Sequence, residues 1–235
     1  MQTSANNTAD VFILGEITSW AWEEYGEHSA VTFKNALDEL GDVDVINLHI
    51  NSPGGSVFEG VAIHNMLKQH KAHVVVHVDA LAASIASVIA MAGDEIRMPS
   101  NSMLMIHNAW TWASGNANDL RKAADDIERI NESVVQSYLN KAGDQLDKDT
   151  LKALLDNETW LSAEEAFNYG LATHVDSAVE AVACVSEKLM KEYKQVPESL
   201  VKPAQQKQAL SDEERQRIIA DSKASLAYLE SQNLL

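Results

Sequence analysis

Short apolar runs alternate with amphipathic stretches along the first 145 residues of the chain. Runs rich in β-branched residues are typical of strands, and apolar residues three or four apart are typical of helices. Strands are predicted at 11–17, 45–50, 73–78 and 103–106, and helices at 29–40, 57–67, 85–92 and 118–142. Strands that alternate with helices indicate an α/β fold built from stacked β-β-α or βαβ units.

Local signals fix several of the expected boundaries. Pro53 and the pair Gly54-Gly55 are expected to stop a strand and form a tight turn. Serine followed three residues later by glutamate predicts a capping box at a helix start. Such boxes are predicted for Ser56 with Glu59, Ser162 with Glu165 and Ser211 with Glu214.

The character of the sequence divides the chain into three parts. A short N-terminal arm is expected over 1–9 and the main domain over 10–178. A helical extension follows over 179–235, with a polar linker near 196–210. The extension reads as a helix to about Tyr193, the linker, and a last helix of weak amphipathicity, so we expect it to lie outside the core.

Composition narrows the class of protein. The chain has 235 residues, 46% of them apolar, and a net charge of −17. This charge disfavours nucleic-acid binding, because a phosphate backbone would be repelled. The alternative explanation of the charge is that it only aids solubility. The single cysteine, Cys184, and the lack of a membrane-length apolar run or a secretion signal favour a cytoplasmic protein without membrane contact.

Two loops of this pattern place reactive groups at strand ends. Ser84 follows a predicted strand and opens an apolar helix, where its hydroxyl would be exposed and the N–H of Ile85 could hold an oxyanion. The N–H of Gly55 could do the same from the neighbouring loop. The alternatives are that Ser84 is a helix cap and that the glycines only make a turn. Adjacent strand ends favour a site, because ligands bind beyond the carboxyl ends of such strands.

His107 ends the fourth predicted strand at the same edge, where a neutral imidazole could take the Ser84 proton. A core histidine is the alternative. Asp156 and Glu158 are candidates for the carboxylate that orients such a base. The remaining histidines make no ligand pattern, so we expect no metal, and no cofactor motif is present.

Four segments in this order resemble the Clp protease proteolytic subunit family. They are INSPGGS at 50–56, AASIAS at 82–87, MLMIHNA at 103–109 and ETWLSAEEAFNYGL at 158–171. The form WLSAEEA looks most like the branch carried by bacteriophages and prophages, in which such enzymes accompany head-assembly genes.

The resemblance implies a superhelical β-β-α fold, like that of Clp proteases and crotonases, with a C-terminal helical tail added. It also implies serine endopeptidase activity inside a ring-shaped homo-oligomer of about six or seven subunits, with the stacking of rings left open. The substrate would be a polypeptide, and for the phage branch a capsid or scaffold protein cut in the host cytoplasm or the prohead. Helix 118–142 would pack subunits or rings together.

Residue by residue, the resemblance puts Ser84 on the nucleophile, His107 on the base and Glu158 on the third triad position, with Asp156 in reserve. The amides of Gly55 and Ile85 fall on the oxyanion hole. Substrate would add as a strand beside the glycine loop and the segment after the histidine. The residues concerned are Gly54, Gly55, Ser56, Val57, Ala109 and Trp110, with the second segment running to about 113.

The sequence departs from the family pattern around the nucleophile. Ala80 and Ala86 replace family glycines, and Glu158 stands where housekeeping enzymes have aspartate. Few residues precede Asp10, which leaves an ATP-driven unfoldase partner open. Two rivals therefore remain: a ring-forming phage assembly or scaffold protein without activity, and a crotonase-type enzyme acting on an acyl-coenzyme A. The crotonase chemistry does not need the Ser84–His107 pair.

Overall fold

A computed structural model describes residues 2–4, 7–21, 27–178 and 193–197 of the chain. These residues lie in one compact unit that spans 1–197. The predicted helix that ends at about Tyr193 falls, apart from that residue, outside the described ranges, as do the helix after Ser211 and the third capping box. No helix in the described ranges is both long enough and apolar enough to span a membrane.

The centre of the fold is an eight-stranded, mainly parallel sheet with the order β1-β2-β3-β4-β5-β8. Strand β4 forks, because β5 pairs with its first half and β6 with its second half, and β7 then pairs antiparallel with β6. The strands are β1 (Gln2–Ser4), β2 (Thr8–Ile17), β3 (Val45–Gly55), β4 (His73–Ala83), β5 (Glu95–Pro99), β6 (Met103–Ile106), β7 (Thr159–Ser162) and β8 (His174–Asp176).

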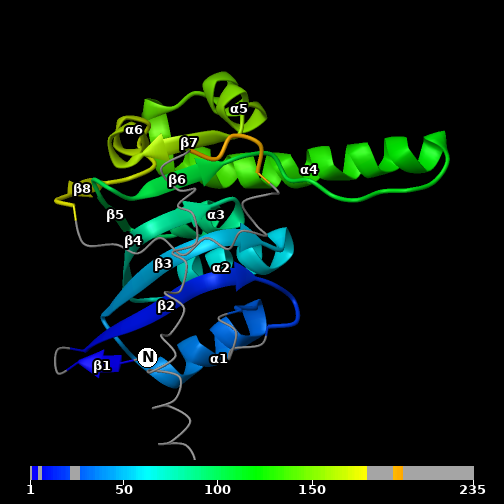
Figure 1. Ribbon diagram of the computed structural model, residues 1–235. Coiled ribbons are helices and arrows are strands. Elements are labelled where there is room, and N and C mark those ends of the chain that lie inside the picture. The colour runs from blue at the N-terminus through cyan, green and yellow to red at the C-terminus, as the bar shows by residue number, and fades with distance from the viewer. Residues whose placement is uncertain (1, 5–6, 22–26, 179–192, 198–235) are drawn as a thin grey trace, which may run out of the picture. The chain divides into compact units, whose positions relative to one another are not determined.

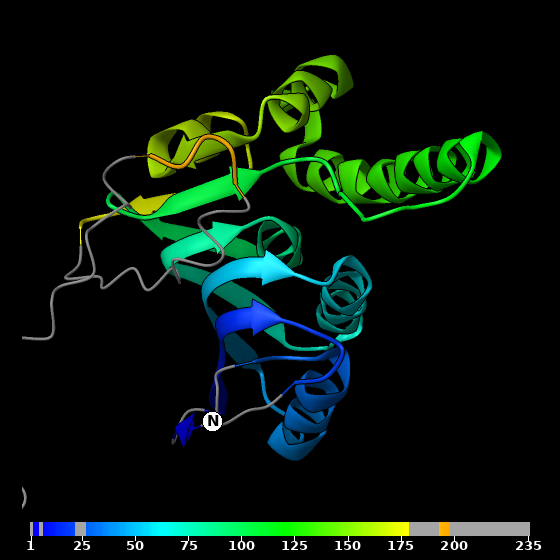
Figure 2. The ribbon, with the colours of Figure 1, turned by 45° about the vertical axis from the view of Figure 1, so that its right-hand side comes forward.

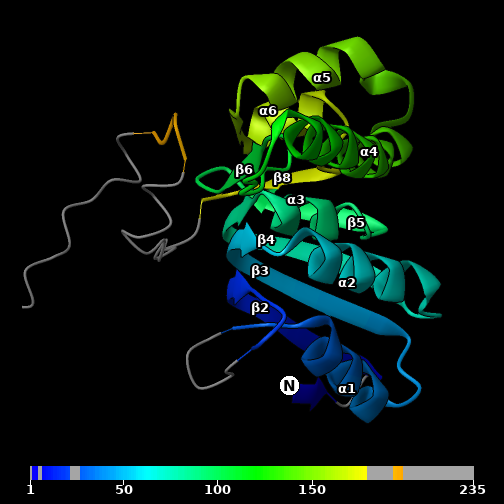
Figure 3. The same cartoon turned by 90° about the vertical axis from the view of Figure 1, so that its right-hand side faces the viewer.

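Successive β–α units stack beside one another, with α1, α2 and α3 on the same face of the sheet (Figures 2 and 3). Each connects parallel neighbours, as the alternating pattern predicted. The helices are α1 (Ala30–Leu40), α2 (Val57–Gln69), α3 (Ile85–Ala90), α4 (Ala117–Ala142), α5 (Lys148–Asp156) and α6 (Ala163–Asn168), with a 3₁₀ turn, η2, at Gly143–Gln145. The predicted mixed α/β architecture is therefore confirmed.

The core lies between the sheet and these helices. In β3 the alternate residues Ile46, Leu48 and Ile50 are fully buried, as period-two alternation requires. The opposite face is more open and carries a row of stacked rings from three adjacent strands. The Phe12 and His49 ring centroids are 4.9 Å apart, and those of His49 and His77 are 4.8 Å apart.

Two strands run further than predicted, and both extensions matter for the site. Strand β3 continues through Pro53 to Gly55, and β4 continues through its alanines to Ala83. The turn expected at Gly54-Gly55 is therefore wrong in detail. The glycine segment stays extended because Ile17 of β2 pairs with Gly55 and Ser52 of β3 pairs with Ala82.

One predicted cap is wrong and one is confirmed. Ser56 makes no side-chain capping bond to α2, and Glu59 Oε2 instead accepts the N–H of Ala30, the first residue of α1, at 2.7 Å. Ser162 and Glu165 do form a capping box at α6. A long-range partner thus displaced the local one at Glu59.

Helix α4 is the most prominent feature outside the stack (Figure 1). It begins at an Asn116 capping box and ends at Gly143, close to the predicted bounds. Val134, Val135, Tyr138 and Ala142, in its last third, are buried against the body. The earlier part projects beyond the sheet and exposes most of its side chains.

Candidate active site

Ser84 lies in the turn between β4 and α3 with an unusual backbone conformation. Its φ is 55° and its ψ is −128°, in a region that residues other than glycine rarely adopt. The Ser84 N–H donates to Met105 O at 2.9 Å, which fixes this turn to β6. The Ser84 side chain makes no capping bond to α3, so its hydroxyl is free of the role that the capping alternative assigned to it.

His107, directly after β6, meets that hydroxyl. The distance from His107 Nε2 to Ser84 Oγ is 2.7 Å. Burial lowers the pKa of His107, the negative charge of Glu158 raises it, and the positive charge of Lys194 lowers it further. Because the net effect is a pKa below the ordinary value, the imidazole is neutral at pH 7 and able to accept the Ser84 proton.

A buried chain of hydrogen bonds through Ser87 and Tyr138 fixes the turn that carries Ser84. The Ser87 hydroxyl donates to Ser84 O at 2.5 Å, so the Tyr138 hydroxyl, 2.6 Å from Ser87 Oγ, acts as donor to Ser87. Burial raises the pKa of Tyr138, which keeps its proton in place for this bond. Helix α4 thereby supports the conformation of Ser84.

The glycine segment of β3 packs directly against the serine turn. A Cβ atom on Gly54 would lie 2.7 Å from both Ala83 O and Ser84 Cβ, and 3.2 Å from Ile85 N. One on Gly55 would lie 2.0 Å from Ile17 O. Both residues have positive φ, 97° and 142°. Only glycine allows this approach, and the predicted adjacency of the two loops is confirmed.

The two candidate carboxylates have different partners. Glu158 is nearly buried, with 9% of its surface exposed, and its Oε1 accepts the N–H groups of Lys194 at 2.6 Å and Gln195 at 2.9 Å. Asp156, at the end of α5, accepts a bond from Asn108 Nδ2 at 2.7 Å. Within the described ranges no hydrogen bond joins either carboxylate to His107, but Glu158 is the one whose charge acts on the ring.

An open cleft of about 440 Å³ lies beside Ser84 and His107. Of the residues predicted to bind substrate, Gly55, Ser56, Val57, Ala109 and Trp110 line it, while Gly54 packs beneath the serine turn.

Sequence reasoning missed two walls of this cleft. One is the segment from Glu16 to Trp20, which consists of the last two residues of β2 and the three that follow it. Its position at the carboxyl end of the first parallel strand, together with the exposed Trp20, was a signal that could have found it. The other wall is Tyr193, whose predicted place in an appendage gave no such signal.

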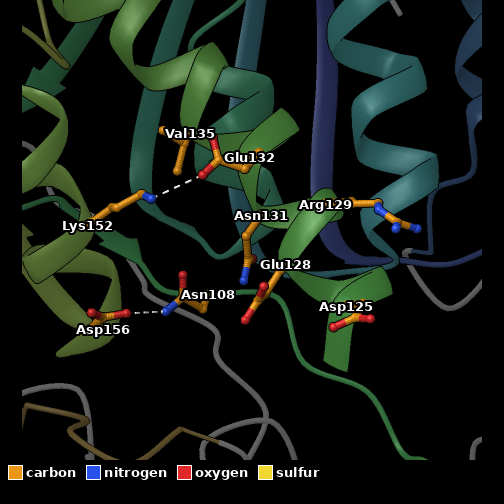
Figure 4. Close-up of a pocket in the computed structure, with 9 residues that line it drawn as sticks. All are labelled: Asn108, Asp125, Glu128, Arg129, Asn131, Glu132, Val135, Lys152 and Asp156. Carbon is orange, nitrogen blue, oxygen red and sulfur yellow. Dashed lines mark hydrogen bonds and ion pairs between the residues drawn. The ribbon is translucent and has the colours of Figure 1, made fainter. Parts of the chain in front are cut away.

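A larger hollow of about 760 Å³ lies between α4 and α5 (Figure 4). Its lining is mostly charged, and Lys152 and Glu132 form an ion pair across it at 3.0 Å. At one side, Asn108 bonds to Asp156 (Figure 4). From α4, Asn131 Oδ1 accepts the Ala109 N–H at 2.7 Å. These bonds fix the direction of the chain after His107, so the side chains that line the hollow help to position one wall of the cleft. Ser84 itself does not line the hollow.

Among the residues that the structure describes, histidine and carboxylate side chains form no group of three or more able to hold a metal ion.

Comparison with known proteins gives one consistent result. The sequence model of the family described as Clp protease matches residues 7–178. The ATP-dependent Clp protease proteolytic subunit of Bacteroides fragilis is 31% identical over 154 residues, which cover 63% of this chain and 73% of that protein. The proteins of the same name from Deinococcus radiodurans and, as subunit 2, from Synechococcus are both 34% identical. They align over 142 and 137 residues, covering 59% and 57% of this chain and 68% and 67% of the relatives.

Proposed function

Because the chain belongs to the Clp protease family of serine peptidases, we propose that it hydrolyses peptide bonds with Ser84 as nucleophile and His107 as base. The observation that carries this assignment is the 2.7 Å contact between Ser84 Oγ and His107 Nε2 at an open cleft. Nucleophile and base within hydrogen-bond reach, with the base in its neutral form, is the arrangement that activates a serine hydroxyl.

The reaction would proceed by acyl transfer. Ser84 Oγ attacks the carbonyl carbon of the scissile peptide while its proton passes to His107 Nε2. The N–H groups of Gly55 and Ile85 stabilise the negative oxygen of the tetrahedral intermediate. His107 then gives the proton to the leaving amine, and a water molecule, activated by the same imidazole, releases the acyl group from the serine.

Glu158 would stabilise the imidazolium that forms on His107 during both steps. Its burial and its electrostatic action on the ring support this role over Asp156, which is bonded to Asn108. A glutamate in place of aspartate retains the carboxylate on which the role depends.

The substrate would bind as an extended polypeptide. Two segments of chain, Gly55 to Val57 and Ala109 to Trp110, line the cleft together with Ser84. Main-chain hydrogen bonds from these segments would hold a substrate strand, which favours unfolded chains over folded ones.

The assembly would be a ring of identical subunits, as the family resemblance implies. Helix α4 supports this part of the proposal, because the apolar Leu120 on its projecting part is 46% exposed. In a ring that encloses the clefts, only unfolded segments or short peptides would reach Ser84.

The biological substrate would be a phage head or scaffold protein. The resemblance of the segment Trp160 to Ala166 to the phage branch supports this role. Co-expression with the capsid proteins of the same gene cluster tests it: cleavage should occur with the wild type and stop with Ser84→Ala. Unchanged cleavage by the variant would remove the role.

The chemistry itself is tested with a serine-directed fluorophosphonate. The wild type should be labelled at Ser84, as located by mass spectrometry, and neither Ser84→Ala nor His107→Ala should be labelled at a comparable rate. A folded, assembled wild type that resists the reagent would favour the alternative of an inactive assembly protein.

A further inference from the structure

Residues 193–195 reach the candidate site from beyond the part of the chain that matches the family. The match ends at residue 178, yet Tyr193 lines the same cleft as Ser84 and His107. This short segment, drawn in orange, lies beside β6 and β7 (Figures 1 and 2). Its contacts involve the base, the acid and the glycine segment at once.

The first contact is with the acid. Glu158 Oε1 accepts two backbone N–H groups, from Lys194 at 2.6 Å and from Gln195 at 2.9 Å. The Gln195 side chain adds a bond from Nε2 to Asn157 O at 2.9 Å. Hydrogen bonds from N–H groups favour the charged form of a carboxylate and fix its direction. Glu158 itself has a positive φ of 49°, a conformation that such local bonds help to maintain.

The second contact is with the base. The edge of the Tyr193 ring packs on His107, with centroids 5.6 Å apart and planes at 88°. Tyr193 also packs on Trp160, at 5.9 Å and 82°, and on the buried cluster of Leu81, Ala83 and Met105. Because the cluster is fully buried, Tyr193 is anchored on rigid strands and shields one side of the imidazole from water.

The third contact is with the glycine segment. The Tyr193 hydroxyl donates to Pro53 O, in the extended stretch that leads to Gly54 and Gly55. One side chain therefore connects the histidine to the strand that carries a proposed oxyanion amide. A contact of this kind holds the reacting groups at the distances and angles that the reaction needs, and this positioning increases the rate.

These contacts leave the site open. The cleft beside Ser84 retains about 440 Å³ with Tyr193 in its wall, and the Ser84–His107 hydrogen bond is intact. A segment that acted as a plug would occupy the cleft or separate this pair. The arrangement is that of a supporting wall.

We propose that Tyr193 and the backbone N–H groups of Lys194 and Gln195 are positioning groups of the catalytic site, supplied by the C-terminal part of the same chain. Tyr193 orients and shields His107, and the two amides orient Glu158 toward its task. The inference rests on the proposed function, because it assigns a role relative to Ser84, His107 and Glu158.

The test compares paired variants of the full chain by the rate of fluorophosphonate labelling at Ser84 as a function of pH. Gln195→Pro removes one N–H donor to Glu158, whereas Gln195→Ala keeps that N–H and loses only the side-chain bond. Labelling by Gln195→Pro should slow about tenfold, the order expected for one hydrogen bond to a charged group, and by Gln195→Ala much less.

Tyr193→Ala and Tyr193→Phe form the second pair. Removal of the ring admits water to His107, so its pKa, which burial lowers, should rise and move the acid limb of the rate profile to higher pH. Tyr193→Phe keeps the ring and should leave the acid limb in place while the rate falls through loss of the bond to Pro53 O. A purely structural role would not move the acid limb.

The outcomes separate the two proposals. A wild type that is not labelled at Ser84 contradicts the proposed function. A wild type that is labelled, with Gln195→Pro and Tyr193→Ala labelled at the same rate and with the same pH profile, overturns only the inference. Faster labelling of these variants would also overturn it and identify the segment as an inhibitory cover. Thermal melts of each variant identify any that fail to fold. If Gln195→Pro or Tyr193→Ala fails to fold, the comparison rests on Tyr193→Phe, whose labelling should be slower than that of the wild type.

Discussion

At the scale of single residues, the protonation state of His107 decides when Ser84 can react. A neutral imidazole is needed, so the rate should fall as pH drops through the pKa of His107. Burial lowers that pKa below the ordinary value of 6.5, and the charge of Glu158 partly opposes the effect. The acid limb of the wild-type profile is therefore expected below pH 6.5.

Two charge variants move this limb in opposite directions. Glu158→Gln removes the charge that raises the pKa of His107, so the limb should move to lower pH and the plateau rate should also fall. Lys194→Met removes a charge that lowers the same pKa, so the limb should move to higher pH. Labelling rates between pH 4.5 and 9, on the order of ten points per variant, measure both shifts. If the acid limbs of Glu158→Gln and Lys194→Met moved in the same direction, the electrostatic account of the His107 pKa would be wrong.

Steric fit at Gly54 gives the second prediction. Gly54→Ala would place a methyl group 2.7 Å from Ser84 Cβ, whereas Gly41→Ala has the same kind of positive φ, 67°, with no atom within 4 Å. Both variants should lose about 1 kcal/mol of unfolding free energy or more to backbone strain. Only Gly54→Ala should lose labelling at Ser84, by about a hundredfold or more, because it displaces the reacting serine. Equal loss in the two variants would show that strain alone, and not the contact with Ser84, is responsible.

At the scale of elements, β3 and β4 are joined on the open face by His49 and Asp79, with His49 Nδ1 3.0 Å from Asp79 Oδ1. This hydrogen bond raises the pKa of His49 against the opposing effect of burial, and the charges of Asp79 and Asp10 also raise it. A pKa raised by folding stabilises the native state fully below the unfolded value. That contribution is lost as pH rises through the folded value.

Asp79→Asn should therefore lower the melting temperature more at pH 5.5 than at pH 8. The neighbouring His77, whose pKa burial lowers, loses in the same variant the charge of Asp79 that raises its pKa, so its contribution adds to the loss of stability at low pH. Calorimetric melts at the two pH values measure the difference. An equal shift at both would show that the pair contributes only a neutral hydrogen bond.

The elements also show where sequence reasoning succeeds and where it stops. Strand and helix positions follow from local periodicity, so β6, α1, α2 and α4 were predicted closely. Strands β5 (EIRMP) and β7 (TWLS) were not predicted, because both are short and neither has a run of β-branched residues. The cap at Glu59 was wrong because its partner, Ala30, lies 29 residues away, where no local pattern shows it.

The site divides in the same way. Ser84 and His107 follow the ends of parallel strands, and fold rules bring such ends together without any knowledge of side chains. Glu158 was chosen from a resemblance, since nothing local distinguishes it from Asp156. Tyr193 was not predicted as a site residue, because it lies beyond the four motifs of the resemblance, in a part of the sequence that was expected to lie outside the core.

At the scale of the whole molecule, the outer part of α4 is the feature that a single chain does not explain. Leu120, Ala123, Ile127 and Ile130 continue the line of Val134 and Tyr138, at spacings of three and four residues that put them on one face. Val134 and Tyr138 are buried in the body, whereas Leu120 is 46% exposed. Ala123, Ile127 and Ile130, which lie between them, are partly exposed. An apolar stripe that continues past its own core favours a second copy of the chain as its cover.

Ile127→Asp tests this cover, and Arg121→Asp, on the other side of the same helix, is its control. Burial of an isoleucine side chain contributes about 1.5–3 kcal/mol, and several copies act together in a ring, so one charge in the stripe should break the assembly at micromolar concentration. Arg121→Asp changes the net charge by more but should leave the mass by light scattering unchanged. Both variants should melt as cooperatively as the wild type, because neither side chain is part of the buried core. If Ile127→Asp keeps the wild-type mass, the stripe is not the contact. If it instead yields single chains that fluorophosphonate still labels at Ser84, assembly controls access to the site and not the chemistry within it.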